Sequence, residues 1–213
     1  MYGYEGLGCI YWHQVSKLLL AIQEVATRAI HQNEAADVVE NLIRAYYRVR
    51  SGLSFEKTVV EYGAFPTDPY SHTPAHAGAQ QPGMTGQVKE EILTRFGELG
   101  VQVEEGAVSF NPVILRREEF LEAPAIYRFY DLRGKARTLD VPAGALAFSF
   151  CQVPVIYRLT TDESWIQVAR VNGESRENPG NRLDSLSSQD LFNRLGGISL
   201  IEVGVPEQSL CRI

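Results

Sequence analysis

The hydrophobic pattern changes its period once along the chain, near Gly100, and this change limits the folds that the chain can adopt. Before Gly100 the apolar residues recur every three or four positions, as they do on one face of a helix. After Gly100 they alternate with polar or small residues, and turn sequences such as Asn172-Gly173 separate the alternating segments. The sequence therefore predicts an α+β protein, with a helical segment over residues 1–100 and an antiparallel β-sandwich over residues 101–213.

Two helices are expected at the start of the helical segment. Apolar spacing places the first from Ile10 to about Ala29, and the second follows a polar turn with Asn33 as its N-cap and Gly52 at its end. Because the turn between them is short, the pair should form an antiparallel helical hairpin.

A third helix is expected over residues 86–99, with Thr85 as its N-cap and Gly100 as a left-handed stop. Beyond it, strands are expected around residues 101–103, 108–110, 126–130, 146–150, 153–159, 166–168 and 198–203. One short helix, capped by Ser187 or Ser188 and running through Leu195, precedes the last strand.

Composition excludes several classes of partner. The net charge of −6 and the absence of a Lys/Arg cluster argue against nucleic acid and against an anionic membrane surface. The cysteines Cys9, Cys151 and Cys211 lie far apart without metal-ligand spacing, which is typical of free thiols in a reducing, cytoplasmic compartment. No secretory signal is apparent, and the apolar run from Leu18 to Ile22 is too short to span a bilayer.

The segment from Glu61 to Glu91 is the most irregular in the chain and holds four of its ten prolines and two of its four histidines. Such a segment, held by a scaffold, is typical of a binding loop. It passes into the third helix after Pro82-Gly83, so the free N–H groups at the helix start and the Thr85 hydroxyl could bind an anion such as phosphate. Capping of the helix would also explain Thr85.

The same segment contains residues that could take part in chemistry. His72 and His76 with Asp68 could bind a metal, but Pro74 lies between the histidines and opposes a shared helical face, so no metal site is predicted. The carboxylates Glu61, Asp68, Glu90 and Glu91 could act as acids or bases. The last two, however, most simply supply charge to a helix N-terminus.

Two short motifs resemble those of a known enzyme family. The sequence Gly8-Cys9-Ile10-Tyr11-Trp12-His13 resembles the G-G-I-[YF]-x-H region of inverting disaccharide phosphorylases of the cellobiose and chitobiose type, in the six-hairpin glycosidase superfamily. About 70 residues later, Pro82-Gly83-Met84-Thr85-Gly86 resembles the Thr-Gly loop of these enzymes. The resemblance covers roughly residues 5–100. It implies that His13, Thr85 and Gly86 bind inorganic phosphate as co-substrate, that no cofactor is needed, and that a partial (α/α)6 toroid precedes the β-sandwich.

The chain also departs from the family pattern. The Glu-Asn pair that precedes the family glycines is not reproduced, because Glu5 is out of register by about one residue and Leu7 and Cys9 intervene. The family's general acid, an aspartate, lies upstream of where this sequence begins, and a complete barrel has many more helices than the three expected here. The resemblance therefore implies the C-terminal part of a larger enzyme. Its partner would be a missing N-terminal barrel chain or a second copy of itself.

The function implied by the resemblance is cleavage of a glycosidic bond in a disaccharide or oligosaccharide. A general acid protonates the leaving oxygen while phosphate attacks the anomeric carbon from the opposite face with inversion. Contacts to the sugar or within the loop are expected from Tyr70, His72, Gln80 and Gln81. The isolated chain should be inactive because it carries no match to the general acid.

Two alternatives remain open from the sequence. An inverting hydrolase would need a carboxylate base, for which Glu5 is the nominated residue. A non-catalytic carbohydrate-binding or structural partner would pack on another chain. A missing partner predicts an exposed apolar face on the first two helices, built from Val15, Leu19, Val38 and Leu42.

Overall fold

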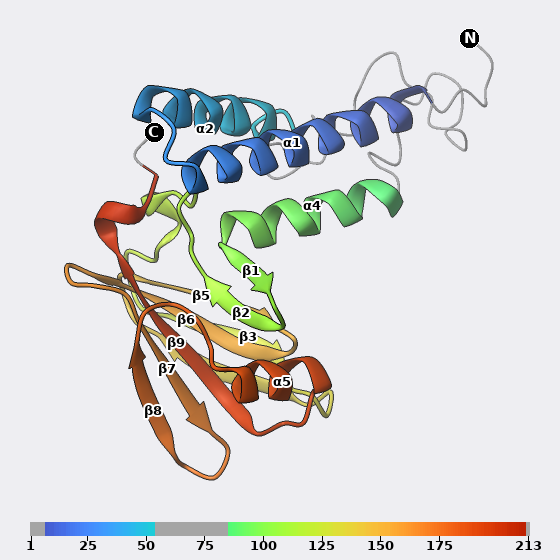
Figure 1. Ribbon diagram of the computed structural model, residues 1–213. Helices are drawn as coiled ribbons and strands as arrows, with labels where there is room; N and C mark the ends of the chain where they lie inside the picture. Colours follow the sequence, from blue (N-terminus) through green and yellow to red (C-terminus); the bar gives the residue numbers. More distant parts are fainter. Residues whose placement is uncertain (1–6, 54–84, 212–213) are drawn as a thin grey trace. The chain divides into compact units, whose positions relative to one another are not determined.

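Figure 1 shows the computed structural model, which describes residues 7–53 and 85–211, with side chains described for residues 13–53 and 89–211. The chain divides between Gly97 and Glu98 into a helical unit and a β-rich unit. The helices of the first unit are α1 (Leu7–His31), α2 (Ala36–Arg50) and α4 (Thr85–Glu98), whose last residue belongs to the second unit. Apart from one short helix before the last strand, helices precede strands along the described chain, and the α+β prediction is correct.

The first two helices form the predicted antiparallel hairpin (Figure 1). Asn33, however, does not cap α2. It adopts a left-handed conformation with φ of 53°, and the next N–H, that of Glu34, donates to the Ala29 carbonyl at the end of α1. Asn33 therefore ends the first helix, a role that its tolerance of positive φ suits, while the N-cap of α2 is Ala35 and makes no side-chain cap hydrogen bond.

One face of α1 is buried along most of its described length. Its buried positions are Ser16, Leu19, Gln23 and Ala26, whereas Leu18 and Val25 are about half exposed, at 52% and 48%. The prediction that Leu19 is exposed is therefore wrong, since this side chain is only 2% exposed. Exposed apolar side chains do occur on all three helices, namely Leu18 and Val25 of α1, Val38 of α2, and Ile92 and Leu93 of α4.

Gln23 joins the three helices of this unit. Its amide nitrogen donates to the Tyr46 hydroxyl of α2 at 3.3 Å and to the Thr94 carbonyl of α4 at 2.7 Å. α4 approaches closely because position 97 is a glycine, where an added Cβ would lie 2.2 Å from the Gln23 side-chain oxygen. A polar residue in the core thus sets how α1, α2 and α4 pack.

The β-rich unit is built on a five-stranded sheet in the order β5-β6-β9-β7-β8. Its strands are β5 (Ala145–Phe150), β6 (Val153–Thr160), β7 (Trp165–Arg170), β8 (Ser175–Pro179) and β9 (Ile198–Pro206). Neighbouring strands are antiparallel except β6 and β9, which are parallel, so the expectation of a purely antiparallel sheet is wrong at this pair. The last strand lies between two strands of opposite direction, so it must run parallel to one of them.

Smaller elements accompany this sheet. Two antiparallel pairs are formed by β1 (Val101–Glu104) with β2 (Ala107–Phe110) and by β3 (Ala125–Tyr130) with β4 (Ala136–Val141). The remaining helices are the 3₁₀ turns η2 (Arg117–Glu119) and η3 (Glu207–Ser209) and the helix α5 (Ser185–Asn193). Asp184, rather than Ser187 or Ser188, is the N-cap of α5, and its carboxylate accepts from the Ser187 N–H at 2.7 Å.

The core of the β-rich unit gathers around Tyr157 of β6, which is fully buried. Its ring packs edge-on against Phe110 and Phe148, and its hydroxyl donates to the Leu99 carbonyl. Gly100 has the predicted left-handed conformation, with φ of 66°, and a Cβ there would lie 2.0 Å from the Asn111 carbonyl carbon. The chain therefore enters β1 through a position that only glycine fits.

Among the helices that the structure describes, none combines the length and the apolar character needed to cross a bilayer.

Candidate functional site

The ends of α1 and α4 that carry the predicted phosphate-binding residues lie together. Residues early in α1 contact residues early in α4, since His13 and Lys17 meet Glu90, and the later Gln23 meets Thr94. The two helices therefore run parallel, and both begin at the same end of the helical unit (Figure 1). Two helix N-termini at one end place two sets of free N–H groups and two positive dipole ends in the same region.

Thr85 and Gly86 are the first two residues of α4, so the helix begins at the predicted place. Gly86 precedes Glu90 by one turn, about 6 Å along the axis, and lies on the same face of the helix. His13 contacts Glu90, so it meets α4 about one turn from the helix start. His13 and the start of α4 therefore lie toward the same end of the helical unit. The side chain of Thr85 lies outside the described residues.

The contact partner of His13 is a buried carboxylate. Glu90 is only 3% exposed, its Oε2 lies 3.5 Å from His13 Nε2, and its Oε1 accepts a hydrogen bond from Lys17 Nζ at 2.8 Å. The interpretation of Glu90 as a charge near a helix N-terminus did not include its burial or its partners. The residue is the centre of a three-residue cluster, His13–Lys17–Glu90, between α1 and α4.

The charge of the cluster follows from the state of Glu90. Burial raises the pKa of this carboxyl, but the hydrogen bond from Lys17, a backbone hydrogen bond and the positive charges of Lys17 and His13 outweigh it and lower the pKa overall. Glu90 is therefore ionised at neutral pH and forms a salt bridge with Lys17. Any positive charge on His13 is then in excess and available to an anion.

Two buried polar atoms in this region have no hydrogen-bond partner among the described residues. They are Glu90 Oε2 and the hydroxyl of Ser16, which is fully buried on the same stretch of α1. Buried polar atoms are almost always paired, with protein or with a bound molecule. Glu90 Oε2 beside His13 and the Ser16 hydroxyl on α1 therefore retain unused hydrogen-bonding capacity.

The other predicted site residues lie outside the described part of the chain. These are Glu5, Tyr70, His72, Gln80 and Gln81, together with the metal candidates Asp68 and His76. Within residues 13–53 and 89–211, no three potential ligand side chains are grouped as a metal site would require.

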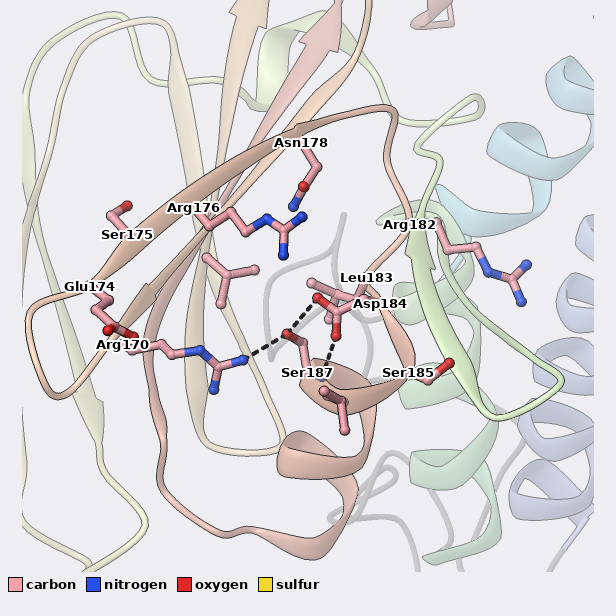
Figure 2. A pocket seen from close by; sticks show the side chains of 12 residues that line it. Arg170, Glu174, Ser175, Arg176, Asn178, Arg182, Leu183, Asp184, Ser185 and Ser187 are labelled. Carbon is pink, nitrogen blue, oxygen red and sulfur yellow. Dashed lines mark hydrogen bonds between the residues drawn. The ribbon is translucent and has the colours of Figure 1, made fainter.

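A separate cavity of about 890 Å³ lies in the β-rich unit, beside β7, β8 and the start of α5 (Figure 2). Arg170 donates to the Ser187 hydroxyl at 3.2 Å and to Asp190 at 3.4 Å, and that hydroxyl donates to Asp184. Arg170 pairs with Asp190, Arg182 donates to the Glu104 carbonyl at 3.1 Å, and α5 is already capped by Asp184. The polar groups at the start of α5 thus bond one another.

Sequence reasoning found the start of α4 but did not single out Lys17 or the contact of Glu90 with His13. One signal was available, because Lys17 follows His13 by four residues and so shares its helix face. A histidine and a lysine on one helix face indicate a carboxylate opposite them, but the identity of that carboxylate depends on how α4 packs.

Comparison of the chain with models of known protein families found no match, and no curated protein matched it.

Proposed function

We propose that this chain is the C-terminal part of a carbohydrate-active enzyme that cleaves glycosidic bonds and most resembles an inverting disaccharide phosphorylase. Inorganic phosphate binds at the start of α4, where the backbone at Thr85 and Gly86 meets His13. The observation that carries the proposal is the parallel packing of α1 on α4, with His13 in contact with Glu90 one turn from the helix start.

The chemistry of these groups suits phosphate. Free N–H groups at a helix start hydrogen-bond phosphate oxygens, and the helix dipole favours negative charge there. Because Lys17 already pairs with Glu90, His13 is the side chain of the cluster that is left for the ligand. Phosphate held in this way would attack the anomeric carbon in place of the water that a hydrolase activates.

The helical unit supports the larger architecture in this proposal. An α1–α2 hairpin followed by a helix parallel to α1 is the arrangement that repeated helical hairpins produce. The exposed apolar residues of α1, α2 and α4 fit a partial (α/α)6 toroid, in which further helices would cover them. A missing N-terminal barrel chain would supply both these helices and the general acid, and the β-rich unit corresponds to the C-terminal sandwich.

The same proposal includes a reducing, cytoplasmic location and an oligosaccharide or disaccharide substrate. Cys151 is a free thiol, and the side chain of Cys9 is outside the described residues.

The structure also gives the hydrolase alternative a specific candidate base. Glu90 is a carboxylate beside His13 with one oxygen that accepts no hydrogen bond, as a residue that activates water would need. Its lowered pKa opposes that role, because a general base works best with a pKa near the operating pH. The phosphorylase form is therefore preferred, with Glu90 as a partner of His13.

Calorimetric titration of the chain with phosphate at constant ionic strength tests the proposal. We expect binding that weakens about tenfold in His13→Ala, because a hydrogen bond to a charged group is lost. His31→Ala is the matched control, since His31 is an exposed residue at the other end of α1, and its affinity should equal that of the wild type. Equal phosphate affinities in the wild type and both variants, or no binding at all, would exclude His13 as a phosphate ligand.

A further inference from the structure

Glu90 is held so that only one of its oxygens can meet His13. Lys17 Nζ donates to Oε1 at 2.8 Å, and this contact, in a residue that is 3% exposed, restricts rotation of the carboxylate. Oε2 is left facing His13 Nε2 at 3.5 Å and accepts no hydrogen bond. Lys17, by holding Oε1, therefore fixes the orientation in which Oε2 faces the His13 ring.

A buried carboxylate oxygen without a donor is unfavourable, and the donor group that the structure places beside it is the His13 ring. Since an ionised carboxylate can only accept, the ring nitrogen that faces it must carry hydrogen. Nε2–H is thus directed to Glu90 in both the neutral and the protonated ring. Nδ1 is then the nitrogen that can meet a ligand.

We propose that Glu90 is a positioning residue, which fixes the tautomer and orientation of His13 so that Nδ1 serves the ligand. The ligand class is an oxyanion such as phosphate, and in this respect the inference rests on the proposed function. Nδ1 donates to a phosphate oxygen when the ring is protonated and accepts from a phosphate hydroxyl when it is neutral. Glu90 itself does not touch the phosphate.

The arrangement predicts a specific effect of Glu90→Gln on the ring. Lys17 is a donor, so it pairs with the amide oxygen of the new side chain and directs the amide NH₂ toward His13. A donor now faces Nε2, which must become an acceptor, and the neutral ring changes from the Nε2–H to the Nδ1–H tautomer. Nitrogen-15 NMR distinguishes these tautomers, and His13 is one of only four histidines to assign.

Two controls use Lys17. Lys17→Met alone should leave the Nε2–H tautomer, because the carboxylate still only accepts. In the double variant Lys17→Met/Glu90→Gln the amide is free to turn its oxygen to the ring, and the Nε2–H tautomer should return. An unchanged tautomer in Glu90→Gln at about pH 8.5, where imidazole rings are mostly neutral, would overturn the proposal.

Phosphate affinity provides a second readout. Glu90→Ala removes a negative charge near an anion, so a purely electrostatic role predicts tighter binding of phosphate. Loss of positioning instead predicts binding that is about tenfold weaker, as for loss of the hydrogen bond from His13. Tighter or unchanged affinity in Glu90→Ala would overturn the positioning role.

The experiments distinguish failure of the proposed function from failure of the positioning role of Glu90. If the wild-type chain binds no phosphate but the tautomer changes in Glu90→Gln as expected, then the proposed function fails and the Glu90–His13 coupling stands. If phosphate binding depends on His13 but the tautomer does not respond to Glu90→Gln, the positioning role fails and the proposed function stands.

Discussion

Gly97→Ala is expected to destabilise the helical unit, although alanine is normally the better helix former. The added Cβ would lie 2.2 Å from the Gln23 side-chain oxygen, so the Gln23 amide must move and give up its hydrogen bonds to Tyr46 and the Thr94 carbonyl. Loss of two hydrogen bonds, each with a net contribution of about 1 kcal/mol, lowers the free energy of unfolding by about 2 kcal/mol. The higher helix propensity of alanine raises the free energy of unfolding by at most about 1 kcal/mol, so the net destabilisation is about 1 kcal/mol.

A double-mutant cycle isolates this contact. In the Gln23→Ala background the clash is absent, and Gly97→Ala should stabilise the unit by up to about 1 kcal/mol. Urea unfolding followed by far-ultraviolet circular dichroism gives the four free energies of unfolding, with an expected coupling of about 2 kcal/mol. If Gly97→Ala has the same effect with and without Gln23, the packing of α1 on α4 described above is wrong.

Four further outcomes are expected. Gly100→Ala should destabilise the β-rich unit by about 2 kcal/mol or more in urea unfolding, because φ is 66° and a Cβ would overlap the Asn111 backbone; an effect below about 0.5 kcal/mol would contradict this. The pKa of Glu90 in the folded chain is lowered from 4.5, so the wild type should be more stable than Glu90→Gln when this carboxyl is ionised. The difference in free energy of unfolding should be complete above pH 4.5 and disappear as the pH falls through the folded-state pKa. A difference in urea midpoint that does not depend on pH would refute this prediction. The wild-type chain should self-associate in size-exclusion chromatography, and Leu18→Glu with Val25→Glu should reduce this without loss of helix content, whereas a monodisperse wild-type monomer at high concentration would count against a missing partner. The chain alone should not turn over aryl glycosides or disaccharides with or without phosphate, since loss of acid assistance reduces the rate by about a hundredfold or more, and robust turnover would mean that the acid is present.

The parts of the fold that could be predicted are those set by local sequence. Periodicity predicts the helical hairpin, the start of α4 and most strands. The left-handed conformation of Gly100 could be predicted because this glycine comes directly after the last apolar residue of a helix. β4 and β8 were missed because both are largely exposed and lack alternation. β8 could have been inferred from Asn172-Gly173, a turn sequence that implies a strand on each side.

The features that could not be predicted depend on tertiary packing. On α1, the positions 15, 18, 22 and 25 and the positions 16, 19, 23 and 26 both form helical faces, and the buried face is the one that contains the polar Ser16 and Gln23. Hydrophobicity alone favours the other face. The parallel pairing of β6 with β9 and the burial of Glu90 likewise depend on partners distant in the sequence.

The central claim is that His13 and the start of α4 form one phosphate site. Its most direct test is a phosphate titration of the nitrogen-15-labelled chain, in which the amide signals of Thr85 and Gly86 and the ring signals of His13 are followed together. The account predicts that all three shift with a single dissociation constant and that the amide shifts weaken in His13→Ala. The account would be contradicted if the His13 ring signals shift with phosphate while the Thr85 and Gly86 amide signals do not. It would also be contradicted if the amide signals shift with a different dissociation constant.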